Sequence, residues 1–428
     1  MGLFNLFRKV IDSEEEIAKT RYKSREAFPN KFDIICPYCF KKFSPNKVVF
    51  RDCHVEDETG YSLVDDKMLK EYLKQIGIQE EQCLMPAVID PERLPSENRK
   101  VIDGVMTEVI DAYGVPTQKR LCPHCHNELP LTSGKGPTKI ISLVGASQVG
   151  KSVYMTALLH ELQNSTMGAF NSALIPVSSK YSDMIKQFEI TLYEMGQMLE
   201  PTQKERHMEP LILQLKFKSE ERPPLTLVFY DVAGEGMTDQ EYLRKHGPHI
   251  EKSDGIIFLV DPLQMKTIRK KIAIRNMDAP GDFTEFYAEP RDVVVNLFEN
   301  FIAKQAKEKT SIPTAVVVTK SDVLKNLDDE DYLGQNSNMF YNYNHRGYFN
   351  INEFHNVSEE VRRFIGKVDP AFKDAIEVYF QNNAYFAVSA LGNKAVDQRI
   401  QGLINSFRID EPFLWLLYQF NYIQGTGD

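Results

Sequence analysis

The octapeptide GASQVGKS, residues 145–152, constrains the fold of this chain more than any other segment. It directly follows the apolar run KIISLV and precedes a helix-forming run, which is the context that a P-loop requires. Its glycines let backbone N–H groups curl around phosphate oxygens, Lys151 reaches the terminal phosphates, and the Ser152 hydroxyl ligates Mg²⁺. The residues predicted to line this loop are Gly145, Ser147, Gln148, Val149, Gly150, Lys151, Ser152 and Val153.

Beyond residue 139, short apolar runs alternate with helical stretches, which is typical of a mostly parallel sheet with crossover helices. The six predicted strands are Lys139–Val144, Leu211–Phe217, Leu225–Tyr230, Gly255–Val260, Thr314–Val318 and Tyr385–Val388. The predicted helices are Lys151–Gln163, Pro290–Ala306, Ser358–Val368, Pro370–Phe380 and a closing helix, EPFLWLLYQFNYI, with an exposed docking helix as its alternative. The fold class is therefore α/β, a three-layer P-loop NTPase with a mostly parallel six-stranded sheet over 139–428.

The magnesium site needs a carboxylate near Ser152. The hydrophobic strand LTLVFY leads into Asp231, Val232, Ala233 and Gly234, which places an acid at the tip of the strand. We therefore predict Asp231 as a second magnesium residue, and Gly234 as a donor of its N–H group to the terminal phosphate.

The choice of base is predicted from Thr319-Lys320-Ser321-Asp322, which follows the strand TAVVV. A carboxylate at Asp322 accepts two hydrogen bonds from guanine, from N1–H and the exocyclic amine, and adenine has no such donor pair. Lys320 would pack its stem over the base and Thr319 would brace the loop. After the last strand, Ser389, Ala390 and Leu391 would offer a backbone N–H to the guanine carbonyl.

These motifs resemble the five-motif signature of the Ras-like (TRAFAC-class) translation-factor and signalling GTPases, over about 139–425. Within that group the chain is most similar to the double-GTPase proteins of bacterial conflict systems, which often carry an N-terminal zinc ribbon. The closer resemblance rests on the CPxC pairs, on LEPTQKERHMEPLILQL and on EPFLWLL. It implies binding of GTP and GDP with Mg²⁺ and hydrolysis of GTP.

The resemblance also implies a switch threonine that senses the terminal phosphate through Mg²⁺. We predict Thr202, with Thr191 as the alternative. Where many such GTPases carry a water-orienting Gln, this chain has Glu235, which could act as a base or face solvent. Intrinsic hydrolysis is therefore expected to be slow, and an arginine from a partner or a second subunit could be needed. Arg244 could act as such an arginine, but a position on the surface is the favoured interpretation.

Four cysteines ahead of the P-loop form two Cys-Pro-x-Cys turns, and we predict that they bind structural zinc: Cys36, Cys39, Cys122 and Cys125. The intervening stretch 40–121 is an insertion with no regular apolar pattern apart from a predicted helix over 65–76. It also contains a predicted loop, PAVIDPERLPSENRK. It exceeds the usual spacing of about 15–20 residues. A redox dithiol is the competing interpretation, and His54, His124, His126 or Cys53 could replace one ligand. This zinc-ribbon-like module spans 31–130, with a linker over 131–138.

The net charge of −9 argues against general attraction to nucleic acid or anionic lipid. No apolar run reaches the roughly 18 residues of a membrane-spanning helix, and the Cys-x-x-Cys pairs suit a reducing compartment, so we expect a cytoplasmic protein. Residues 1–30 are predicted to form an arm whose apolar residues 3–11 could pack on the protein, a partner or a membrane. The aromatic insert 331–354 could bind a partner, stack on bases or pack on itself.

Three hypotheses follow. In the first, a regulatory GTPase releases switch segments near 196–208 and 231–245 when the terminal phosphate is lost, and so changes what the zinc module and a partner protein can contact. In the second, the chain is a nucleotide-binding sensor or scaffold with little hydrolysis. In the third, it is an ATPase of the wider P-loop class.

Overall fold

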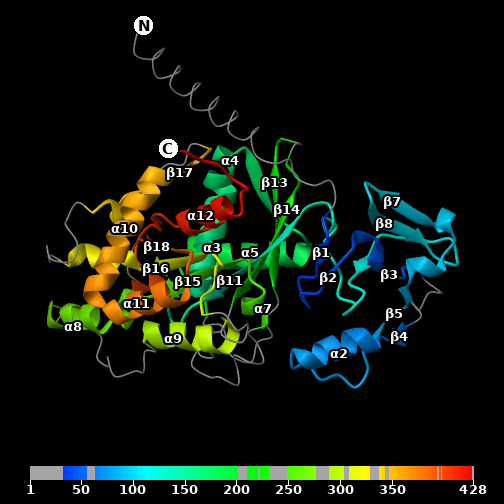
Figure 1. The fold of residues 1–428 in the computed structure, drawn as a ribbon, viewed down its shortest axis with the longest axis horizontal. Helices are drawn as coiled ribbons and strands as arrows, with labels where there is room; N and C mark the ends of the chain where they lie inside the picture. The colour runs from blue at the N-terminus through cyan, green and yellow to red at the C-terminus, as the bar shows by residue number, and fades with distance from the viewer. Residues whose placement is uncertain are drawn as a thin grey trace, which may run out of the picture.

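The computed structural model describes residues 32–54, 63–200, 210–219, 222–231, 248–275, 289–302, 308–327, 337–342, 347–392, 395–396 and 398–426. A seven-stranded mixed sheet with strand order β12-β13-β14-β11-β15-β16-β18 forms its centre (Figure 1). The strands are β11 (Thr138–Val144), β12 (Ser172–Pro176), β13 (Leu211–Phe217), β14 (Leu225–Asp231), β15 (Gly255–Val260), β16 (Thr314–Val318) and β18 (Asn383–Ala387).

The predicted α/β P-loop fold is confirmed, but the predicted number of six strands is wrong. Strand β12 is the additional one, and it pairs antiparallel with β13, as β13 does with β14. The other neighbouring pairs are parallel. Only alternate positions of β12 are buried, because it lies at the edge of the sheet. Its short run, SALIP, therefore lacks the continuous apolar signal of the central strands.

The central strands are buried along nearly their whole length, including residues that point to opposite faces. Both faces of the sheet are therefore covered. The covering helices are α3 (Lys151–Glu161), α4 (Met167–Ala169), α5 (Ser179–Glu189), α7 (Pro248–Glu251), α8 (Lys266–Arg275), α9 (Pro290–Leu297), α10 (Ile351–Val368), α11 (Pro370–Tyr379) and α12 (Glu411–Gln419). Three of them continue into π-helical turns, Leu162–Thr166, Ile190–Glu194 and Phe298–Ile302. The sequence did not predict α5, and α10 begins earlier than expected.

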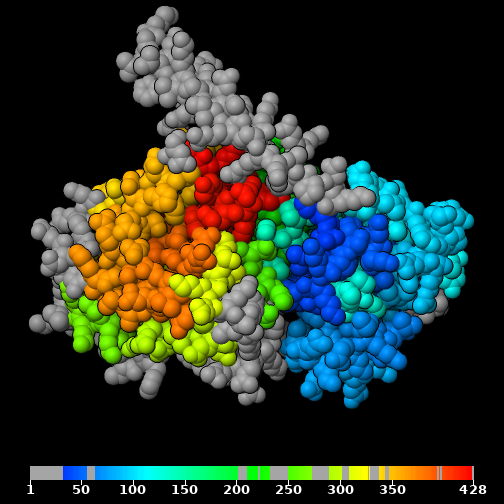
Figure 2. Space-filling view, viewed as in Figure 1, coloured from blue at the N-terminus to red at the C-terminus, as the bar shows by residue number. Residues whose placement is uncertain are grey.

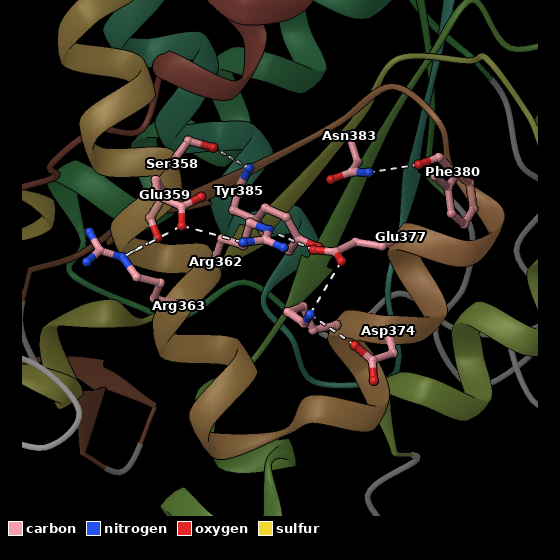
Figure 3. Close-up of polar contacts among 10 residues, drawn as sticks. Ser358, Glu359, Arg362, Arg363, Asp374, Glu377, Phe380, Asn383 and Tyr385 are labelled. Atoms are coloured by element: carbon pink, nitrogen blue, oxygen red, sulfur yellow. Dashed lines mark hydrogen bonds and ion pairs between the residues drawn. The ribbon is translucent and has the colours of Figure 1, made fainter.

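Helices α10 and α11 form a pair that supports edge strand β18. Asn350 and Asp369 cap the two helices by accepting backbone N–H groups one turn later. Figure 3 shows Arg362 of α10 reaching Glu377 of α11 (2.7 Å), and Ser358 accepting the backbone N–H of Tyr385 (2.9 Å). These contacts fix the strand that leads directly into Ser389.

Helix α12 is the predicted closing helix. Phe413 to Leu417 are all buried, and Phe354 at the start of α10 stacks on Trp415. Phe349 in turn stacks on Tyr418. Phe349 and Phe354 belong to the aromatic insert 331–354, and both therefore pack on the protein itself.

Residues 32–130 carry their own buried cluster, which includes three of the four paired cysteines. In Figures 1 and 2 these blue and cyan residues form a lobe beside the sheet. Its elements are β1 (Ile34–Ile35), β2 (Lys42–Phe43), β3 (Val49–Arg51), β4 (Leu63–Asp65), α2 (Lys67–Gln75), β5 (Leu84–Pro86), β6 (Val88–Ile89), β7 (Arg99–Ile102), β8 (Val105–Ile110), β9 (Pro116–Thr117) and β10 (Arg120–Leu121). The helix predicted over 65–76 is present as α2, but the rest of the insertion 40–121 contains short strands and is not irregular.

The segment 131–138 packs closely against both parts of the chain. Arg120 is buried and donates to the carbonyls of Ser133 (2.9 Å) and Pro130 (2.9 Å). A Cβ on Gly136 would lie 1.8 Å from the carbonyl oxygen of Pro224, so only glycine fits at this approach. Among the described helices, none combines the length and apolar character needed to cross a membrane.

Candidate nucleotide site and cysteine cluster

The loop between β11 and α3 has the backbone shape that phosphate binding needs. Gly150 and Gln148 adopt left-handed conformations (φ 86° and 64°), and a Cβ on Gly145 would approach the carbonyl oxygen of Leu259 to 2.6 Å. Gly150 caps α3 without a side-chain hydrogen bond, so an anion can satisfy the first N–H groups of this helix. The loop geometry therefore fits a bound phosphate.

Lys151 lies inside this loop. Its ammonium donates to the carbonyls of Gly145 (3.1 Å) and Ala146 (3.2 Å), and the residue is only 8% exposed. Val149 is buried, Ser147 is half-buried and Gln148 is exposed. The last two residues of the predicted phosphate loop, Ser152 and Val153, lie in the first turn of α3.

Asp231 ends strand β14, which runs parallel to β11 with Leu143 opposite Asp231. The carboxyl ends of both strands meet at one edge of the sheet, where ligands of open α/β sheets bind. The oxygen Oδ1 of Asp231 is buried and has no hydrogen-bond partner among the described residues. Burial raises the pKa of Asp231, and the positive charge of Lys151 opposes that rise. A buried carboxylate oxygen beside a phosphate loop fits a Mg²⁺ ligand.

The loop after β16 is attached to the P-loop and to the end of β15. The Thr319 hydroxyl lies 3.0 Å from the carbonyl oxygen of Val149 and 3.2 Å from that of Val260. The Lys320 ammonium lies 2.9 Å from the carbonyl oxygen of Gln148. These contacts place the predicted base-binding loop directly beside the predicted phosphate-binding loop.

The structure also joins the two predicted guanine motifs. The Ser389 hydroxyl donates to Asp322 Oδ1 (2.6 Å) and accepts the backbone N–H of Gly392 (2.9 Å). Ser321 N–H donates to the carbonyl of Val388 (3.1 Å). Ser389 is buried, and the adjacent Ala390 and Leu391 are half-buried. Ser389 therefore orients the carboxylate that would read the base.

The sequence analysis did not single out Asp261, whose carboxylate lies 2.6 Å from the Lys320 ammonium. It directly follows the buried strand GIIFLV, as Asp231 follows LTLVFY. The sequence signal that could have identified Asp261 is its position as an acidic residue at the carboxyl end of a buried strand.

Several predicted residues fall outside the described part of the chain: Thr202, Gly234, Glu235, Arg244 and the arm over 1–30. The alternative switch residue, Thr191, is half-buried in a π-helical turn, and its hydroxyl donates to the carbonyl of Gln187 (2.9 Å).

The four paired cysteines converge, and their Sγ atoms all lie within 4.8 Å of one another. Cys36 lies 3.6 Å from Cys125, and Cys39 lies 3.6 Å from Cys122. Tetrahedral zinc with Zn–S bonds near 2.3 Å places sulfur atoms about 3.8 Å apart, so this set fits zinc. The short distances join opposite turns, whereas a redox dithiol would pair the two cysteines of one turn.

The two cysteine turns have the same backbone design. Cys36 and Cys122 each accept an N–H four residues later (3.0 Å in both turns), from Phe40 and His126. Both of those residues adopt left-handed conformations, with φ of 59° and 52°. Because the turns match, they present their sulfur atoms in equivalent ways.

The residues considered as substitute ligands make other contacts. His126 pairs with the buried carboxylate of Asp66 (2.7 Å), and Cys53 lies 3.2 Å from the Thr117 hydroxyl. His54 stacks on Tyr113, and the ring of His124 meets that of Phe43 edge-on. Within the described residues, the metal-ligand cluster consists of the four cysteines alone.

The first cysteine turn contacts the strand that carries Asp231. The hydroxyl of Tyr230 donates to the carbonyl of Pro37, and its ring packs against Phe40 (5.5 Å) and stacks on His249 (4.5 Å). The cysteine cluster and the candidate magnesium ligand are therefore linked through one buried side chain.

We predict that the purified chain carries about one zinc ion, and that Cys122→Ser reduces the bound zinc to a small fraction and lowers the thermal unfolding midpoint, because a structural zinc site stabilises the fold around it. Metal analysis and thermal unfolding of protein purified under reducing conditions test this. Cys53→Ser is the control, since Cys53 lies outside the cluster. Full zinc occupancy in Cys122→Ser would contradict the four-thiolate assignment.

Comparisons with known proteins bear on this arrangement. A family model described as Double-GTPase 2 matches residues 139–365, which is more than half of the chain. A curated relative from Mycolicibacterium smegmatis, named as an ESX-1 scaffolding and assembly protein, SaeC, is 24% identical over 412 residues, covering 91% of this chain and 99% of the relative.

Solved GTPase structures are more distant. The Arl6 BBS3 small GTPase of Trypanosoma brucei is 10% identical with a TM-score of 0.30, over 67% of this chain and 99% of that one. Era of Aquifex aeolicus is 14% identical with a TM-score of 0.26, over 68% of this chain and 58% of that one. At such TM-scores neither likeness carries an argument about mechanism.

Proposed function

Because the chain belongs to the Double-GTPase 2 family, we propose that it is a regulatory GTPase that binds GTP with Mg²⁺ and switches its contacts with partner proteins. One observation carries this proposal. The P-loop, Asp231 and the Asp322–Ser389 pair meet at the carboxyl edge of a single sheet, where one guanine nucleotide could contact all three.

The phosphates would lie in the cradle of 145–153. Backbone N–H groups of Gly145, Ser147 to Gly150 and the start of α3 would donate to them, and Lys151 would leave its carbonyl partners to reach the β- and γ-phosphates. Ser152 and Asp231 would hold Mg²⁺, with Thr202 completing the site in the GTP state. Bound Mg²⁺ neutralises charge on the transferred phosphoryl group.

The base would be selected by Asp322; its Oδ1 accepts the Ser389 hydroxyl, and the remaining lone pairs of its two oxygens would accept from guanine. A carboxylate accepts from the N1–H and exocyclic amine of guanine, a pair that adenine lacks. Ala390 and Leu391 would supply the N–H for the guanine carbonyl, and Lys320 would cover one face of the ring.

Hydrolysis would proceed by attack of water on the γ-phosphorus, with cleavage of its bond to the β–γ bridging oxygen to give GDP and inorganic phosphate. Glu235 stands where a water-orienting residue is expected, and Gly234 would donate its N–H to the γ-phosphate. An acid beside an anionic phosphate slows the intrinsic reaction, so a partner would supply the missing positive charge.

The contact between Tyr230 and Pro37 supports a role for the cysteine module in this switch. A conformational change at Asp231 would be transmitted through Tyr230 to the turn that holds Cys36 and Cys39. The named scaffolding and assembly role of the M. smegmatis relative, which matches along nearly its whole length, supports protein partners as the output. A cytoplasmic location and a place in a bacterial conflict system remain predictions.

An alternative function is a nucleotide sensor or scaffold with little hydrolysis, which Glu235 favours. Anaerobic purification, chromatography of the bound nucleotide and parallel phosphate-release assays with GTP and ATP separate the possibilities. Bound guanine nucleotide with GTP-selective phosphate release supports the regulatory GTPase. Bound guanine nucleotide without release supports the sensor, and adenine nucleotide contradicts the assignment of Asp322.

A further inference from the structure

The Lys320 ammonium lies between two partners from different elements. It donates to the carbonyl of Gln148 in the P-loop (2.9 Å) and to Oδ2 of Asp261 after β15 (2.6 Å). Lys320 also adopts a left-handed backbone conformation, with φ of 48°. A non-glycine residue keeps such a conformation only where its surroundings hold it.

Asp261 is the fixed member of this ion pair. It is 3% exposed, and its second oxygen, Oδ1, accepts the backbone N–H of Leu263 (2.8 Å). The Lys320 side chain, by contrast, is 44% exposed. The carboxylate is buried and is held by the Leu263 N–H, whereas the lysine is a flexible chain, so the carboxylate sets the position of the ammonium.

We propose that Asp261 is a positioning residue for guanine-nucleotide binding, which holds Lys320 against the P-loop with its methylene stem in place over the base. This inference rests on the proposed function. Without Asp261 the lysine side chain would sample many rotamers and would have to be ordered when nucleotide binds, which lowers affinity. Asp261 itself need not touch the nucleotide.

The other end of β15 offers a matched control. Asp254 immediately precedes the strand, and its carboxylate has the same two kinds of partner, the Lys139 ammonium (2.7 Å) and the backbone N–H of Ile140 (2.9 Å). It lies at the amino end of the strand, away from the P-loop edge. Loss of charge at Asp254 therefore removes a comparable ion pair without touching Lys320.

The test is the affinity of the full-length chain for fluorescent mant-GDP, with thermal unfolding measured on every variant. Asp261 caps the short 3₁₀ helix Pro262–Gln264, and both Asp261→Asn and Asp261→Ser keep a side chain that can accept the Leu263 N–H while removing the charge. Each is expected to weaken binding about tenfold. Asp254→Asn is expected to stay within about twofold of the unaltered chain.

A double-mutant cycle shows whether Asp261 acts through Lys320. Lys320→Ala should weaken binding, and adding Asp261→Asn to it should cause no further loss. Folded Asp261 variants with unaltered affinity would overturn the inference, as would a double variant in which the two losses multiply. Failure of the unaltered chain to bind mant-GDP would instead overturn the proposed function.

Discussion

Replacement of Lys151 by alanine is expected to lower the affinity for GTP by about two to three orders of magnitude. Charge-assisted hydrogen bonds contribute about 1.5–3 kcal/mol each, and the ammonium would make more than one to the phosphates. Lys151 also opposes the rise in the pKa of Asp231 that burial causes. Its removal therefore raises that pKa further.

Equilibrium titration with GTP and Mg²⁺ measures this loss. Lys186→Ala is the matched control, because Lys186 is an exposed lysine of α5. Lys151→Arg is expected to fail almost as badly as Lys151→Ala, since the residue is only 8% exposed and a bulkier planar guanidinium does not replace a compact ammonium in such a loop. Unchanged affinity in Lys151→Ala would show that 145–153 does not bind phosphate.

Substitution of Asp322 by asparagine is expected to turn guanine selectivity into xanthine selectivity. An asparagine keeps an Oδ1 atom that can accept the Ser389 hydroxyl, so the loop should stay folded. Its amide replaces one acceptor by a donor, which mismatches the guanine amine and matches the xanthine carbonyl. Loss of one charge-assisted bond, the clash of two donors and the weakening of the other bond to a neutral one together imply a loss of GTP affinity of about 100-fold or more.

Competition of GTP, XTP and ATP for the same site provides the measurement. Asp374→Asn serves as the control, because this carboxylate is 66% exposed on α11 and pairs with the neighbouring Lys373. An Asp322→Asn protein that still prefers GTP over XTP would contradict the assignment of Asp322. Tight binding of ATP by the unaltered chain that Asp322→Asn leaves unchanged would revive the ATPase hypothesis.

The sequence predicted the central strands accurately because their signal is local. Strands β13, β15 and β16 begin and end where the apolar runs do, and the P-loop lies between a strand and a helix as its spacing requires. The GTPase class was also predicted from four short motifs, each at a strand end. The closer resemblance to the double-GTPase proteins came from the CPxC pairs and two further segments, and the family match confirms it. Runs that are buried on both faces are recognisable without knowledge of their neighbours.

Strand β12 and the cysteine module were harder to predict because their structure depends on contacts with residues distant in the chain. The strand SALIP is half exposed and exists through its pairing with β13. In the module, Arg51 pairs with Asp66 (2.8 Å), and Asp66 also pairs with His126. No local pattern in the sequence reveals that Arg51, Asp66 and His126 lie in contact.

The sequence by itself determined the phosphate loop, the candidate base-reading carboxylate and the candidate zinc ligands, because each is a short motif whose chemistry depends on residue type and spacing. Only the tertiary structure decided how they connect. The connecting contacts are the hydrogen bond from Ser389 to Asp322, the ion pair of Lys320 with Asp261, and the hydrogen bond from Tyr230 to Pro37. Those contacts join residues far apart in the chain. Hydrogen bonds and ion pairs act over a few ångströms of space, and sequence distance does not specify which groups come that close.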